Sequence, residues 1–160
     1  AEKAGVEYLR LLRPASPLPE NCLVFESAKQ AAEALAAEEG NLLLATGAKE
    51  LAQFAAISPE RLYPRVLPTL ESIAACEAAN IPHRNIIAMQ GPFSFALNQA
   101  MMEQFHIRWL VTKDGGAAGG FDEKASAASA AGAQLVVIRR PPEQGETASE
   151  VLKRCKEMIR

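Results

Sequence analysis

The sequence has no long apolar run. Its apolar segments are all far shorter than the roughly 20 residues that a membrane-spanning helix needs, and its start does not have the pattern of a secretory signal peptide. Its formal net charge is only −2, with acidic and basic residues interspersed. It therefore has no bulk positive charge with which to bind nucleic acid or an anionic membrane. These shortages predict a protein with neither a membrane nor a nucleic acid as its partner.

Cysteine and histidine are also scarce. Cys22, Cys76 and Cys155 lie far apart, so no C-x-x-C metal pair exists, and an odd, scattered set is typical of reduced thiols in a cytoplasmic protein. Neither His83 nor His106 follows an apolar run of the strand type. No Ser-His-Asp set, carboxylate pair or metal-ligand set can be assembled. We predict no metal site and assign no catalytic residue, as in enzymes whose ligand brings its own reactivity.

What the sequence does have is a regular alternation of short apolar runs with helical patterns. The runs are continuously apolar, which indicates strands buried on both faces. This pattern predicts an α/β fold: a three-layer, doubly wound (Rossmann-like), mostly parallel sheet with helices on both faces. Strands are expected at residues 23–25, 42–45, 65–67, 86–89, 109–112 and 135–138.

Helix ends carry capping signals. Ser27 with Gln30, and Thr147 with Glu150, match the capping-box pattern of a helix N-terminus. Pro92 is expected in the first turn of a helix, where a proline is tolerated. Another helix is expected to begin at Thr69, with the apolar residues Leu70, Ile73, Ala74 and Ala78 on one side.

A proline-rich segment, Arg13-Pro14-Ala15-Ser16-Pro17-Leu18-Pro19, predicts a linker, because proline disfavours both helix interiors and central strands. The expected division is therefore residues 1–19, the end of a preceding domain with the linker, and residues 20–160, an α/β domain.

Ligands of open α/β sheets bind beyond the carboxyl ends of the strands. The first such end is followed by Thr46-Gly47-Ala48-Lys49. Its glycine would let the backbone approach a ligand, and a helix N-terminus would offer N–H groups to an anion. The second is followed by Gln90-Gly91-Pro92-Phe93-Ser94, with two polar side chains near the sheet edge. An ordinary strand-to-helix turn and a helix cap are the alternative interpretations of the two segments.

The most glycine-rich loop follows the predicted strand at residues 109–112. It reads Lys113-Asp114-Gly115-Gly116-Ala117-Ala118-Gly119-Gly120. Such a run costs chain entropy unless the backbone bends sharply or approaches a ligand. It is neither a Walker loop nor a G-x-G-x-x-G fingerprint. We interpret it as a ligand-covering loop; a plain flexible turn is the alternative.

Several segments at these strand ends resemble the precorrin-6A reductase family, and they occur in the family's order. They are Thr46-Gly47-Ala48-Lys49-Glu50-Leu51, Arg65-Val66-Leu67-Pro68, Met89-Gln90-Gly91-Pro92-Phe93-Ser94, Thr112-Lys113-Asp114-Gly115-Gly116 with Gly119-Gly120, Glu123-Lys124, and Ile138-Arg139-Arg140-Pro141. The resemblance extends over essentially the whole chain. It departs at Ala48 and Gly115, where the family usually has serine, so both positions lack a hydroxyl that would bind an anion.

The resemblance implies two Rossmann-like domains with the active site between them. It implies NADPH (or NADH) as cofactor and hydride transfer to one carbon–carbon double bond of a tetrapyrrole, precorrin-6A or cobalt-precorrin-6A, giving the 6B product. Most of the family's N-terminal domain, which opens with a strand and a Gly-Gly-Thr type turn, is not found in this sequence. The chain is therefore expected to be a fragment, and to be inactive alone because the implied site lies between the domains. The alternative function is a tetrapyrrole- or nucleotide-binding α/β module that catalyses nothing.

The substrate of that family carries many carboxylates, so cationic side chains at the strand ends are expected to bind it. These are Lys49, Arg65, Lys113 and Lys124. Gln90 and Ser94 are expected to bond the cofactor's amide or the macrocycle. The full set of predicted cofactor- or substrate-binding residues is Thr46, Gly47, Lys49, Arg65, Gln90, Gly91, Ser94, Lys113, Asp114, Gly115, Gly116, Gly119, Gly120 and Lys124.

Overall fold

The computed structural model describes residues 8–12, 17–115, 120–140 and 145–158. The chain divides into two compact units. The larger contains residues 16–140, and the smaller joins residues 1–15 to residues 141–160. The domain boundary expected near residue 19 stays a prediction.

The larger unit is built on a six-stranded sheet in which every pair of neighbouring strands is parallel. Its strand order is β1-β6-β5-β2-β3-β4. The bounds are β1 Leu23–Phe25, β2 Asn41–Ala45, β3 Leu62–Val66, β4 Ile87–Ala88, β5 Ile107–Lys113 and β6 Gln134–Ile138. The all-parallel sheet confirms the predicted α/β class.

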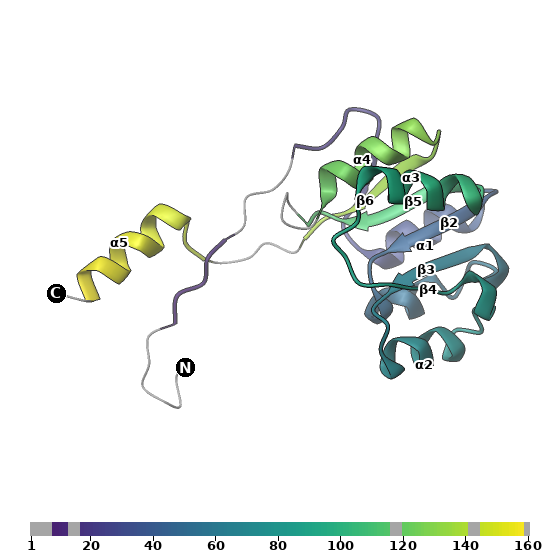
Figure 1. The fold of residues 1–160 in the computed structure, drawn as a ribbon, viewed down its shortest axis with the longest axis horizontal. Helices are drawn as coiled ribbons and strands as arrows, with labels where there is room; N and C mark the ends of the chain where they lie inside the picture. Colours follow the sequence, from purple (N-terminus) through teal and green to yellow (C-terminus); the bar gives the residue numbers. More distant parts are fainter. Residues whose placement is uncertain (1–7, 13–16, 116–119, 141–144, 159–160) are drawn as a thin grey trace. The chain divides into compact units, whose positions relative to one another are not determined.

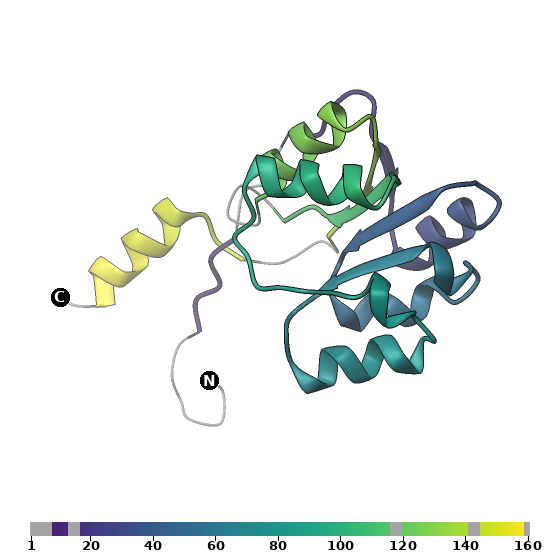
Figure 2. The ribbon, with the colours of Figure 1, turned by 45° about the vertical axis from the view of Figure 1, so that its right-hand side comes forward.

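Helices cover both faces of this sheet, as Figures 1 and 2 show. One face packs against α1 (Ala28–Ala36), the 3-10 helix η2 (Ala48–Phe54) and α2 (Leu70–Ala78). The other packs against α3 (Phe95–Gln104) and α4 (Phe121–Ala130). Two short 3-10 turns, η3 (Pro59–Arg61) and η4 (His83–Asn85), precede β3 and β4.

Side chains of the central strands alternate between the two helix layers. In β2, Leu42 and Leu44 pack toward α1 and η2, whereas Leu43 packs toward α3 and α4. All three are buried. Because a strand between two helix layers buries both of its faces, its sequence is continuously apolar rather than alternating. This is the physical reason why the apolar runs predicted strands correctly.

Several helix signals are confirmed. The Ser27 hydroxyl accepts a hydrogen bond from the Gln30 backbone N–H at 3.2 Å and caps α1. Thr69 caps α2 in the same way, accepting from the Ser72 N–H at 3.3 Å. Gly132, just beyond α4, has a φ of +70°, the left-handed conformation in which glycine often ends a helix.

Strand β3 is longer than the segment predicted for it and begins earlier, at Leu62. It includes Pro64, which the sequence interpretation placed outside the strand. Pro64 pairs with Leu44 of β2, but β4 pairs only with Arg65 and Val66. Pro64 therefore has a ladder neighbour on one side only, and a strand tolerates a proline where its missing N–H is not needed.

The apolar side that the sequence gives α2 is not the side that the structure buries. Leu70 is 87% exposed, and the buried residues of the helix are Ser72 and Cys76. Apolar residues lie around most of the circumference of this helix, so the sequence pattern does not single out one face. Cys76 belongs to the core on this side of the sheet.

The helix after β4 begins later than predicted. Pro92 lies outside α3, which starts at Phe95. Ser94 sets this start, because its hydroxyl accepts a hydrogen bond from the Leu97 N–H at 3.3 Å.

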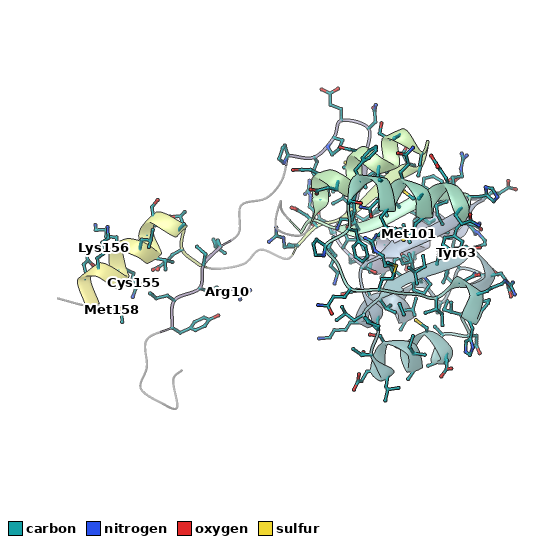
Figure 3. The ribbon with its side chains drawn as sticks, viewed as in Figure 1. Arg10, Tyr63, Met101, Cys155, Lys156 and Met158 are labelled. Carbon is teal, nitrogen blue, oxygen red and sulfur yellow. The ribbon has the colours of Figure 1, made fainter. Side chains whose placement is uncertain are left out.

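The smaller unit joins the two ends of the chain. Leu11 forms an isolated parallel bridge with Glu146, whose backbone N–H donates to the Arg10 carbonyl at 2.8 Å. Helix α5 (Ala148–Met158) follows, with the predicted capping box: the Thr147 N–H donates to the Glu150 carboxylate at 2.7 Å. No described residue of α5 is buried; Cys155 and Met158 are labelled on it in Figure 3.

Candidate functional site

The order of the strands locates the crevice in which a ligand of this fold binds. From β2 the chain runs to β3 and β4 on one side of the sheet, and it then returns to β5 and β6 on the other. At the carboxyl ends of the neighbouring strands β2 and β5, the chain therefore leaves in opposite directions: from β2 toward β3, and from β5 toward β6. Open α/β sheets bind ligands at such a switch point, and the loops that begin at Thr46 and Asp114 start there.

A pocket of about 630 Å³ opens at this edge of the sheet. The ends of β2, β3 and β4 and the start of α4 supply its walls. The structure brings five of the predicted site residues together in it: Gly47, Arg65, Gly91, Gly120 and Lys124. Apolar side chains, including Val66, Met89 and Phe93, line the rest of the pocket.

Arg65, at the carboxyl end of β3, is only 7% exposed. Its guanidinium donates to the Asn98 side-chain oxygen at 2.7 Å and lies over the Phe93 ring, 4.0 Å from the ring centroid. Burial lowers the pKa of Arg65 to about 10, so the group stays charged at neutral pH. The pocket therefore contains a fixed positive charge held by a hydrogen bond and an aromatic face.

Asn98 on α3 holds this charge in place and was missed by the sequence interpretation. It is 1% exposed, and its amide nitrogen donates to the carbonyls of Ser94 at 2.9 Å and Phe93 at 3.3 Å. These two bonds leave its oxygen to accept from Arg65. The available signal was an amide side chain one helical turn before the apolar Met101, because an amide on a buried helix face needs hydrogen-bond partners.

Lys124, in the first turns of α4, is the second cation of the pocket. It is 8% exposed, and its ammonium forms no hydrogen bond or ion pair with any described residue. Burial, and then the charge of Arg65, lower the pKa of Lys124 to about 8, while the Glu123 carboxylate opposes the shift. Near neutral pH the pocket thus contains two positive charges.

Two glycines at the rim of the pocket have left-handed backbone conformations. Gly47 has a φ of +81°, and Gly120, the N-cap of α4, has a φ of +62°. No atom lies within 4 Å of the position that a Cβ would take at Gly47. Glycine is therefore needed at residue 47 for its backbone angle rather than for lack of space.

Four other predicted site residues, Lys113, Ser94, Lys49 and Gln90, do not line this pocket. Lys113 ends β5, and its ammonium donates to the Glu50 carboxylate at 2.8 Å. Ser94 caps α3. Lys49 and Gln90 are exposed and do not line the pocket.

Three further polar groups stand at the carboxyl edge without a hydrogen-bond partner among the described residues. The Thr46 hydroxyl is buried after β2. After β5 and β6, Asp114 and Arg140 lie 3.7 Å apart as an ion pair, each with a buried atom that makes no hydrogen bond. A ligand that reaches this edge would meet a hydroxyl, a carboxylate and a guanidinium. Gly115 lies beside them, whereas the predicted residues Gly116 and Gly119 are outside the described residues.

A second pocket, of about 450 Å³, lies at the opposite edge of the sheet, where Arg108 and Gln134 stand in the first residues of strands β5 and β6. The described ranges contain no group of three metal-ligating side chains and no helix long and apolar enough to cross a membrane. The carboxyl-edge pocket with its two buried cations is therefore the candidate site.

Comparison with known proteins identifies the family. The family model described as Precorrin-6x reductase CbiJ/CobK matches residues 1–156. The chain belongs to this family.

Curated relatives of the CbiJ/CobK family agree with this assignment. The chain is 33% identical over 124 residues to a protein named cobalt-precorrin-6A reductase from Priestia megaterium, covering 74% of this chain and 49% of the relative. It is 36% identical over 123 residues to a protein of the same name from Methanococcus maripaludis, covering 75% and 48%. The chain thus spans about half the length of the curated relatives that it matches.

A solved structure named CobK precorrin-6A reductase has the same fold. It matches with a TM-score of 0.74 and 20% identity, covering 98% of this chain and 64% of that one. At this identity the likeness supports the fold of the CbiJ/CobK family and not the roles of individual residues.

Proposed function

We propose that this chain forms part of a reductase that uses NADPH or NADH to reduce one carbon–carbon double bond of precorrin-6A, or of cobalt-precorrin-6A, to the 6B product. The family match over residues 1–156 carries the proposal. The pocket at the switch point of the sheet supports it, since that is where this fold binds its ligands.

The residues of the pocket fit the anionic groups of both reactants. A dinucleotide carries phosphates, and the macrocycle carries carboxylates. Arg65 and Lys124 supply positive charge, and Gly120 is the N-cap of α4, an N-terminus that no side chain of the described residues caps. Met89 and Phe93 offer apolar surface for a flat ring.

In this proposal the chain contributes binding, orientation and electrostatics. The nicotinamide supplies the hydride when it is bound, and the other carbon of the double bond takes a proton. Arg65, fixed by Asn98 and Phe93, would anchor an anionic arm and so fix the position of the ring. The apolar wall around Val66 and Met89 would exclude water from the reacting face.

We further propose that the complete active site needs a second domain. The support is that the 124 residues of this chain that match the Priestia megaterium relative make up only 49% of that relative's length. A cytoplasmic location is proposed from the free cysteines Cys22, Cys76 and Cys155.

The experiment compares two proteins: the 160-residue chain, and a protein in which it is joined to the N-terminal half of a relative such as the Priestia megaterium reductase. Oxidation of NADPH is followed at 340 nm with precorrin-6A and, separately, with its cobalt form. We expect turnover by the two-domain protein and little or none by the chain alone. Comparable turnover by the chain would contradict the interdomain site, and ligand binding without turnover by both would favour a non-catalytic binding module.

A further inference from the structure

Arg65 and Lys124 share one pocket, and neither forms an ion pair with a described carboxylate, although Glu123 acts on Lys124 through its charge. Both are more than nine-tenths buried. They come from different elements, β3 and α4, and face the same space. The charge of Arg65 disfavours the charged form of Lys124, because it contributes to lowering the pKa of Lys124.

Two buried positive charges in one pocket are unfavourable unless an anion binds between them. Burying a charge without a partner carries a large desolvation penalty, and a neighbouring like charge adds to it. The fold nevertheless holds the guanidinium firmly, with a 2.7 Å bond to Asn98 and the Phe93 ring at 4.0 Å. A charge fixed and left unneutralised beside a pocket indicates that its counter-charge arrives with a ligand.

We propose that Arg65 and Lys124 together bind one oxyanion, a carboxylate or a phosphate group of the ligand, at the carboxyl end of β3. The inference concerns the pocket of the proposed reductase and rests on that function only for the identity of the natural ligand. The macrocycle would bring a carboxylate and the cofactor a phosphate, and both groups present oxygens that a guanidinium and an ammonium bind.

Binding of this oxyanion is coupled to a proton. The charged groups that face Lys124 are Arg65 from β3 and Glu123 from its own helix. An anion between the two cations favours the charged form of Lys124 and raises its pKa above about 8. Above pH 8 the site therefore takes up a proton as it fills, and anion affinity falls as the pH rises further.

The test uses the 160-residue chain carrying ¹³C-labelled lysine. Inorganic phosphate and sodium acetate are titrated separately at pH 8.5, with sodium chloride keeping the ionic strength constant. The Lys124 Cε resonance is assigned by its loss in Lys124→Met. We expect this resonance to shift saturably with at least one of the two anions, and its titration midpoint to move to higher pH when that anion is bound.

Lys124→Met should weaken anion binding at least tenfold, measured from backbone amide shifts of residues lining the pocket. Lys29→Met is the matched control, because Lys29 is exposed on α1, on the other face of the sheet, 3.9 Å from Glu33. It should leave the affinity unchanged. Arg65→Lys keeps the positive charge but loses the planar guanidinium, which can bind an oxyanion through two N–H groups at once. We expect it to weaken anion binding while the chain stays folded.

A response to phosphate alone would assign the pair to a nucleotide phosphate, and a response to acetate alone to a carboxylate arm. No response of Lys124 to either anion, or an unchanged affinity in Lys124→Met, would overturn the proposal. The measurement involves neither NADPH oxidation nor a macrocycle. If the two-domain protein showed no reductase activity, the proposed function would be refuted, but anion binding by Arg65 and Lys124 would still stand.

Discussion

At the scale of single residues, Asn98 links α3 to the charge at the end of β3. Its side chain bonds Arg65 on one side and the Ser94 and Phe93 carbonyls on the other. Asn98→Leu keeps the volume similar but leaves a buried guanidinium without its hydrogen-bond partner. We expect the free energy of unfolding to fall by about 2 kcal/mol, since hydrogen bonds to charged groups contribute roughly that much.

Urea unfolding would measure the effect of Asn98→Leu. Gln99→Leu serves as the control at the next position of α3, where the amide bonds the exposed Glu103 side chain at 2.8 Å. It should change the stability by less than about 0.5 kcal/mol. Equal losses in the two variants would mean that Asn98 does not support Arg65.

The lowered pKa of Lys124 makes the free energy of unfolding depend on pH. Its pKa is about 8 in the folded chain and near 10.5 when exposed. Between these values the unfolded state binds more protons, so the free energy of unfolding rises with pH across this window. Below pH 8 the buried charge costs stability, on the order of 1 kcal/mol for each unit of pKa shift.

The prediction is tested by comparing wild type with Lys124→Met from pH 7 to 10. The variant should be more stable at pH 7, and the difference should shrink as the pH rises. Cys76 is a second group in this range, because burial and then Glu77 raise the pKa of its thiol. It is present in both proteins and cancels from the difference. A difference independent of pH would contradict the shifted pKa.

The sequence placed Arg65 and Lys124 among the site residues through the family resemblance, but it could not show that both are buried. Burial depends on how β3, α3 and α4 pack together, which no local pattern encodes. Asn98 escaped notice for the same reason. Its role exists only because the chain brings residue 98 within 2.7 Å of residue 65.

At the scale of elements, α3 offers a direct comparison of two roles for Ser94. The resemblance suggested a ligand contact, whereas the structure uses the hydroxyl to cap the helix. Ser94→Ala should lower the free energy of unfolding by about 1 kcal/mol, and Ser94→Asp should retain most of the stability.

Thermal unfolding of these variants is compared with that of Ser126→Ala, an exposed position inside α4. That control should be neutral or slightly stabilising, since alanine is the better helix former. If Ser94→Ala is as stable as wild type, the cap contributes little and a ligand role for the hydroxyl gains support.

Elements buried on both faces were the easiest to predict. β2, β5 and β6 are continuous apolar runs in the centre of the sheet, and their positions were correct to within about two residues. β3 and α2 were harder. In β3 the proline at residue 64 looked like a boundary, and α2 has apolar residues on several faces. In both cases the tertiary partners decide what the local pattern leaves open.

At the scale of the whole molecule, the strand order determines where the site lies. Alternation of strands and helices predicts a parallel sheet, but it does not determine that β2 and β5 are neighbours. That adjacency creates the switch point and places the ends of β2 and β3 beside the start of α4. The sequence could therefore predict the class of fold and the candidate edge, but not which strand ends meet.

The two compact units of the chain also differ in how much of their apolar side chains they bury. The larger unit has cores on both sides of its sheet, whereas α5 of the smaller unit keeps Leu152 62% exposed and Met158 58% exposed. Met101 and Tyr63, labelled in Figure 3, belong to the larger unit and its α3 side. Stability measured on this chain therefore reflects the α/β sheet far more than α5.

The fluorescence of Trp109 allows unfolding of the sheet to be followed separately from unfolding of α5. It is the single tryptophan of the sequence, it is buried in β5, and its indole N–H donates to the Glu39 carbonyl at 2.8 Å. It packs with the α1 side of the sheet, away from the α3 and α4 layer. Tryptophan fluorescence, excited at a wavelength at which Tyr8 and Tyr63 do not absorb, thus reports opening of the sheet core, whereas the state of α5 has to be followed by a backbone signal such as circular dichroism.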